Sequence, residues 1–63
     1  MLQPGNIVKC PPDMGEGEYY ARVVSIGEAE QTAFNGTNFR WVTVRHQKYK
    51  TQHVWPSNRL NKL

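Results

Sequence analysis

The sequence FRWVTVRHQKYKTQHVW, residues 39–55, decides the fold because it has the pattern of a β-hairpin. Side chains on residues 40–45 alternate between aliphatic and polar or aromatic, and residues 51–55 repeat the alternation. A period of two is typical of strands that bury one face. We therefore predict two strands joined by a turn at residues 46–50.

A symmetric turn predicts the register of this hairpin. The predicted pairs are Arg45 with Thr51, Thr43 with His53, and Trp41 with Trp55. In this register Val42 and Val54 point into the core, and two tryptophans, a histidine and an arginine share the outer side. A register shifted by one residue would exchange the inner and outer sets.

The length of the chain allows one small domain. Its 63 residues are near the lower limit for folding without a disulfide or a metal, and a deep catalytic cleft is not expected in a monomer. The only cysteine, Cys10, has no partner for an internal disulfide, so we expect a buried apolar side chain and a reducing, cytoplasmic location. No run is apolar enough for a signal peptide or a membrane span, and no membrane is expected as a partner.

Charge is divided unevenly along the chain. The net charge is +3 with both histidines neutral. The first thirty residues hold all five acids and two basic residues, a net −3, whereas the remainder holds six basic residues and no acid, a net +6. A folded domain with this asymmetry can present one basic side, the electrostatic footprint of a protein that binds a polyanion. The alternative is a solvated basic surface without a ligand.

Two further strands are predicted before the hairpin. Residues 7–10 (IVKC) and 19–26 (YYARVVSI) are rich in β-branched and aromatic residues, and an acidic loop, residues 13–18, joins them. Residues 27–38 are predicted to be a long connection. Within it, Asn35-Gly36 favours a tight turn with strand on either side.

The end of the chain completes the predicted fold. Pro56 cannot continue a central strand, so residues 56–60 are predicted as a 3₁₀ turn and residues 61–63 as a short edge strand. This order predicts an all-β domain, a single five-stranded SH3-like barrel over residues 1–63. The predicted core is Ile7 or Val8, Tyr20 or Ala21, Val24, Ile26, Val42, Val44, Val54 and Leu60.

The predicted outer side suggests a binding site made of flat rings and cations. Tryptophan rings stack on nucleobases, and lysine and arginine contact phosphates. The same rings could cage a methylated ammonium group, or one of them could close the end of the barrel. The predicted nucleic-acid or partner-binding residues are Arg40, Trp41, Arg45, Lys48, Lys50, His53, Trp55 and Arg59.

No constellation of catalytic residues is recognisable. The sequence has no serine nucleophile elbow, no glycine-rich phosphate loop and no pair of opposed acids. His46, His53 and Cys10 lack the spacing of a compact zinc motif. We expect no enzymatic activity, no cofactor and no metal.

The ending TQHVWPSNRLNKL, residues 51–63, combines a strand, a proline-containing turn and a final aliphatic strand, and it resembles three groups of SH3-like barrels. Retroviral and retrotransposon integrase C-terminal domains end similarly, and this resemblance implies DNA binding. The photosystem I accessory subunit family is similar at residues 5–9 (GNIVK) and 42–45 (VTVR), but its asparagine-rich ending is absent here.

The third group is the plasmid-borne type II dihydrofolate reductase family. Each of its four chains gives the active pore a Val-Gln-Ile-Tyr strand followed by proline. Aligned on Pro56, the matching stretch here is QHVW, so His53 and Trp55 stand where that family has the glutamine and the tyrosine that hold cofactor and pterin. This resemblance implies a tetrameric reductase.

We predict a non-enzymatic small basic barrel that binds nucleic acid, DNA in preference to RNA, through Trp41, His53, Trp55 and the surrounding basic residues. The alternative is a protein-interaction module, an accessory or inhibitor subunit from a mobile element or phage, that grips an acidic protein surface with the same residues. The tetrameric reductase is the third interpretation. We expect a monomer or a small homo-oligomer.

Overall fold

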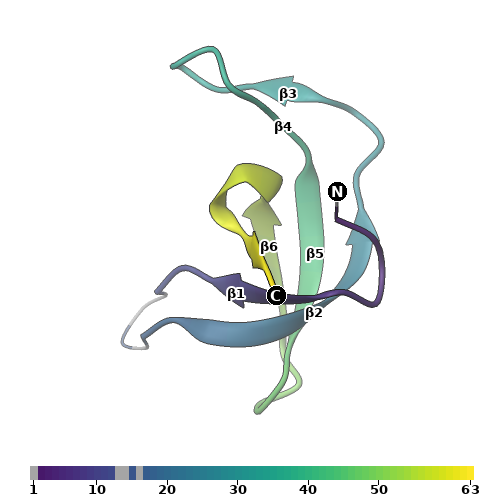
Figure 1. Cartoon of the computed structure of the whole chain (residues 1–63), viewed down its shortest axis with the longest axis vertical. Helices are drawn as coiled ribbons and strands as arrows, with labels where there is room; N and C mark the ends of the chain where they lie inside the picture. The colour runs from purple at the N-terminus through teal and green to yellow at the C-terminus, as the bar shows by residue number, and fades with distance from the viewer. Residues whose placement is uncertain (1, 13–14, 16) are drawn as a thin grey trace.

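The computed structural model describes residues 2–12, 15 and 17–63 of the chain. One antiparallel sheet of five strands, in the order β6-β5-β2-β1-β7, curls into a small barrel, and a two-stranded ribbon, β3–β4, projects from one end (Figure 1). The elements are β1 Ile7–Cys10, β2 Tyr19–Ile26, β3 Gln31–Thr32, β4 Asn38–Phe39, β5 Trp41–His46, β6 Gln52–Pro56, the 3₁₀ turn η1 Ser57–Arg59 and β7 Asn61–Lys62.

The predicted SH3-like barrel is confirmed, with its 3₁₀ turn before the last strand. The turn is joined to the start of β5, because Ser57 N–H donates to the Arg40 carbonyl at 2.8 Å and Arg40 N–H donates to Ser57 Oγ at 3.0 Å. Leu60 then enters the core, and β7 pairs with β1. Of the predicted acidic loop, Asp13, Met14 and Glu16 lie outside the described residues.

The core lies between the strands on the concave side of the sheet. Every second residue of β1 and of the first part of β2 is buried, which is the alternation that the sequence predicts for half-buried strands. Cys10 is buried, as expected for a small apolar side chain. The buried apolar residues are Val8, Cys10, Tyr19, Ala21, Val23, Val42, Val44 and Leu60.

The alternation along β2 overturns part of the predicted core. Ala21 and Val23 are buried, so Val24 lies on the opposite side and points outward. A β-bulge between Val23 and Ser25 leaves it without a partner in the ladder. Val24 is 43% exposed, and its prediction as a core residue is wrong. Of the two alternatives at the start of β2, Ala21 is buried and Tyr20 is half exposed.

The register of the β5–β6 hairpin is also corrected. Val44 pairs with His53 and Val42 with Trp55, one residue away from the predicted pairs. The turn is shorter than predicted because His46 ends β5 instead of opening the turn, and its N–H donates to the Thr51 carbonyl at 2.8 Å. His53 and Trp55 therefore face inward, and Val54, predicted in the core, is 57% exposed.

The connection between β2 and β5 forms the predicted turn with strand on either side. Asn35 accepts the Thr37 N–H at its Oδ1, at 3.0 Å, and Gly36 adopts a φ of 83°, which glycine reaches without steric cost. At the base of the ribbon, Gly27 N–H donates to the Trp41 carbonyl at 2.7 Å. A Cβ at Gly27 would lie 3.1 Å from the same oxygen, so this close approach favours glycine.

The corrected register makes a stability prediction. Val44→Ala should lower the free energy of unfolding by about 1–3 kcal/mol, because it opens a cavity beside fully buried neighbours. Val54→Ala should change it by less than about 0.5 kcal/mol, because its side chain is mostly in solvent. Urea unfolding followed by circular dichroism compares the two variants. Equal losses would contradict the register described above.

Candidate nucleic-acid interface

The convex side of β2, β5 and β6 carries the exposed side chains of the sheet. We call this surface the outer face. Because partners in an antiparallel ladder point to the same side, Arg22 lies beside Arg45 and Arg45 beside Gln52, while Thr43 lies beside Val54. The outer face consists of Tyr20, Arg22, Val24, Trp41, Thr43, Arg45, Gln52 and Val54.

Three cations meet at one end of the outer face. Arg22 and Arg45 are direct cross-strand partners, and with Lys50 they line a hollow of about 380 Å³, the basic hollow, completed by His46 and Gln47. None of the described residues that line it is an acid. Within residues 2–12, 15 and 17–63 the only ion pair joins Lys9 Nζ and Glu18 Oε1, at 3.3 Å. Among these residues Arg22, Arg45 and Lys50 therefore have no salt-bridge partner, and the basic hollow is electropositive.

The β5–β6 turn is held by a buried histidine. His46 is 4% exposed, and its ring stacks on Tyr19 with the centroids 4.5 Å apart. Its Nδ1 accepts the backbone N–H groups of Lys48 and Tyr49, at 3.0 and 3.1 Å. An Nδ1 that accepts two donors carries no proton, which leaves the ring proton of the neutral form on Nε2. His46 thus fixes the turn that carries the lysines.

Lys50 closes this turn in a strained conformation. Its φ of 63° is the only positive φ of a non-glycine residue among the described residues. The left-handed region costs an L-residue about 1–2 kcal/mol, and glycine or asparagine would occupy it more cheaply. Lys48 lies over the Tyr49 ring, with its Nζ 5.2 Å from the centroid. The two lysines are thus presented by an ordered turn.

Trp41 stands at the other end of the outer face. Its side chain is 47% exposed, and the Phe39 ring meets it edge to face, with the centroids 5.2 Å apart and an interplanar angle of 88°. The Trp41 carbonyl also accepts a hydrogen bond from the Gly27 N–H, which holds the Trp41 backbone in place. An exposed indole that is supported at its edge can stack on a flat ligand with little loss of conformational freedom.

The inward-facing side chains form an aromatic cluster inside the barrel. Trp55 Nε1–H donates to the Tyr19 hydroxyl at 2.8 Å, and the His53 ring lies 5.5 Å from the Tyr19 ring. Burial raises the pKa of the neighbouring Cys10 thiol, and a hydrogen bond with Tyr19 opposes that rise in part. A thiol with a raised pKa stays protonated at neutral pH and is a poor nucleophile. The cluster packs the interior of the barrel, and the Cys10 thiol beside it is unreactive.

The predicted site residues therefore lie on different parts of the barrel. Trp41, Arg45 and Lys50 lie on the outer face or its basic hollow, and Lys48 lies in the adjacent turn. The prediction that Trp41, His53 and Trp55 share one side is wrong, because the last two face inward. Arg40 and Arg59 lie at the ribbon end of the barrel, because Arg40 N–H donates to Ser57 Oγ and Arg59 lines one hollow with residues of the β3–β4 ribbon.

The site residues predicted from the sequence do not include Arg22, although Arg22 lines the basic hollow. The alternation in YYARVVSI puts Arg22 opposite the buried side chains of Ala21 and Val23, so its outward direction could have been read from the sequence. Its position beside Arg45 could not, because that depends on the register between β2 and β5.

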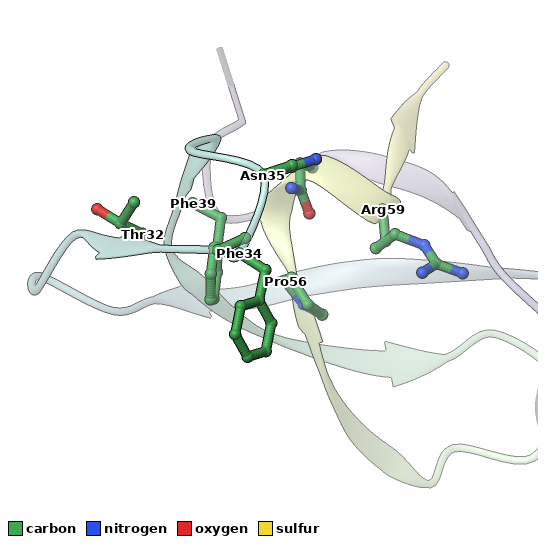
Figure 2. Close-up of a pocket in the computed structure, with 8 residues that line it drawn as sticks. Thr32, Phe34, Asn35, Phe39, Pro56 and Arg59 are labelled. Carbon is green, nitrogen blue, oxygen red and sulfur yellow. The ribbon is translucent and has the colours of Figure 1, made fainter.

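A second hollow, the ribbon-end hollow, lies between the tip of the β3–β4 ribbon and η1. Its volume is about 860 Å³. Figure 2 shows Phe34, Phe39 and Pro56 close together, with the Arg59 side chain extending away from them. Phe34 is fully exposed. The lining residues are Thr32, Ala33, Phe34, Asn35, Phe39, Pro56, Asn58 and Arg59.

Comparison with known proteins finds no matching family model, no matching curated protein and no matching solved structure. In the part of the chain that the structure describes, no helix has the length and apolar character to cross a membrane. In the same part, no three histidine, cysteine, aspartate or glutamate side chains converge as metal ligands would.

The role of His46 can be tested by substitution. His46→Ala should lower the free energy of unfolding by about 2–4 kcal/mol, because it removes a buried stacked ring. It should also speed amide hydrogen exchange at Lys48 and Tyr49, which lose their acceptor. His46→Asn restores a side-chain acceptor near these amides and should recover their protection but not the packing. Unchanged exchange at both amides in His46→Ala would contradict this role.

Proposed function

We propose that this protein is a non-enzymatic barrel that binds nucleic acid through its outer face and the β5–β6 turn. The observation that carries the proposal is the basic hollow, where Arg22 and Arg45 lie side by side with Lys50 and no acid is among the lining residues that the structure describes. Like charges directly opposite each other destabilise a sheet. A phosphate between them would convert that repulsion into attraction, and arginine can contact it through two N–H groups at once.

The aromatic part of the proposed site is Trp41. Stacking on an exposed indole is tolerant of sequence, because every base has a flat face. We exclude His53 and Trp55 from the proposed contacts because they face inward. Arg40 and Arg59 are excluded because they lie at the ribbon end. The proposed contact residues are Arg22, Trp41, Arg45, Lys48 and Lys50. DNA is the first ligand to test, and a cytoplasmic location, supported by the single cysteine, is part of the proposal.

Removing one guanidinium from the basic hollow should weaken binding. We expect Arg45→Gln to reduce affinity for a short oligonucleotide about 5–20-fold at low salt and to lower the slope of log affinity against log salt by about one phosphate contact. Arg59→Gln removes the same charge at the ribbon end and is the matched control, with little expected change. Fluorescence anisotropy at several salt concentrations measures both variants. A binding curve that is insensitive to salt, or equal losses in both variants, would refute the proposal.

A second candidate function is protein interaction at the ribbon-end hollow. The observation that favours it is Phe34, a fully exposed phenylalanine beside the half-buried Phe39 and Pro56. An exposed aromatic side chain beside a hollow that is lined partly by apolar residues is typical of interaction sites. A protein partner would then bind at the ribbon-end hollow, which is a different surface from the one that the sequence indicated.

Phe34 should matter for a partner but not for folding. We expect Phe34→Ala to leave the free energy of unfolding within about 0.5 kcal/mol of the wild type, because the ring makes no buried contact. If the ribbon-end hollow binds a protein, affinity capture with the variant should lose that protein while Arg45→Gln retains it, as read by mass spectrometry. Identical captured proteins with wild type and Phe34→Ala would exclude this surface.

A further inference from the structure

We infer that the outer face takes single-stranded rather than duplex nucleic acid. This inference rests on the proposed function and specifies its ligand. It concerns strands with unpaired bases, whether DNA or RNA. Three features of the outer face carry it: the order of its chemical groups, the outward position of two valines, and the charge of the elements that project from the barrel.

The groups on the outer face change in character along β5. Arg45, beside Arg22, lies at one end, Thr43 in the middle and Trp41 at the other end. Arg45 and Trp41 are four residues apart on one strand, a separation of about 13 Å. A few nucleotides of an extended strand cover this distance, with a phosphate in the basic hollow and a base on the indole. A duplex keeps its base faces inside the stack, so Trp41 would have nothing to stack on.

Two valines lie between the cations and the indole. Val24 is 43% exposed and Val54 is 57% exposed, because both fall on the outer side of the alternation along their strands. Phosphates on the surface of a duplex gain nothing from an apolar strip, whereas the sugars and bases of an open strand can cover it. The apolar strip therefore favours a ligand with exposed bases.

The projecting elements do not suit a duplex groove. The β3–β4 ribbon has the shape that can enter a major groove, and Figure 1 shows it extending from the barrel. However, residues 27–39 contain two acids, Glu28 and Glu30, and no lysine or arginine. Both acids precede β3, so the ribbon itself carries no charge, and it has no cation that would attract the phosphates that line a groove. The β5–β6 turn is basic, but it is short and folded around His46, so it can contact phosphates without filling a groove.

The test compares ligands on the unaltered protein. Fluorescence anisotropy at matched salt would use a ten-nucleotide single strand, the same sequence as a duplex, and the RNA version of the single strand. We expect at least tenfold tighter binding of a single strand than of the duplex. Trp41→Ala should reduce single-strand affinity about 5–150-fold, the range of one lost base stack, with an unchanged salt slope. Trp41→Phe should retain most of the affinity, and circular dichroism confirms that both variants fold.

The outcomes separate this inference from the proposed function. Salt-dependent binding that is equal for duplex and single strand, or unaffected by Trp41→Ala, overturns the single-strand inference and leaves nucleic-acid binding in place. No salt-dependent binding to any of the three ligands overturns the proposed function and this inference together. Tighter binding of the DNA or of the RNA strand than of the duplex supports the inference and identifies the sugar that the site accepts.

Discussion

The stacking of His46 on Tyr19, together with the two backbone N–H groups that donate to His46, is the interaction on which the proposed binding surface depends. A histidine at the end of a hairpin strand could belong to the turn or to the strand. Here Tyr19 of β2 covers its ring, so the side chain is buried and the residue becomes the last of β5. Its Nδ1 then defines where the turn begins, because the N–H groups of Lys48 and Tyr49 are directed back toward it.

The direction of every side chain on β6 follows from this contact. When His46 ends β5, the register assigns His53 and Trp55 to the interior, where Trp55 donates to the same Tyr19 that stacks on His46. A single tyrosine therefore joins the turn, β2 and β6 into one packed unit. The outer face keeps two arginines, two valines and one tryptophan beside Tyr20, Thr43 and Gln52, because the other tryptophan and both histidines face inward.

Local features of the sequence predict the elements well, whereas contacts between distant segments decide the site. The strand bounds at residues 7–10 and 19–26 follow from composition and from the prolines and glycines that flank them, and Asn35-Gly36 is sufficient to predict its turn. The length of the β5–β6 turn depends on Tyr19, which no local pattern connects to His46. In the same way, the bulge between Val23 and Ser25 depends on the pairing of β2 with β5, and propensity contains no information about it.

Two features of the basic hollow lower the stability of the barrel. A domain of this size has a free energy of unfolding of about 3–9 kcal/mol in total. Against that total, a left-handed lysine costs about 1–2 kcal/mol and a directly opposed pair of arginines adds repulsion. Neither feature contributes to the packing of the core. Glycine in place of Lys50 would remove the backbone strain, and glutamine in place of Arg22 or Arg45 would remove the repulsion. Strain and unbalanced charge coincide in this hollow, although the barrel does not need them to fold. A phosphate bound there, as proposed, would offset the repulsion between the arginines, which is the reason for placing the ligand in this hollow.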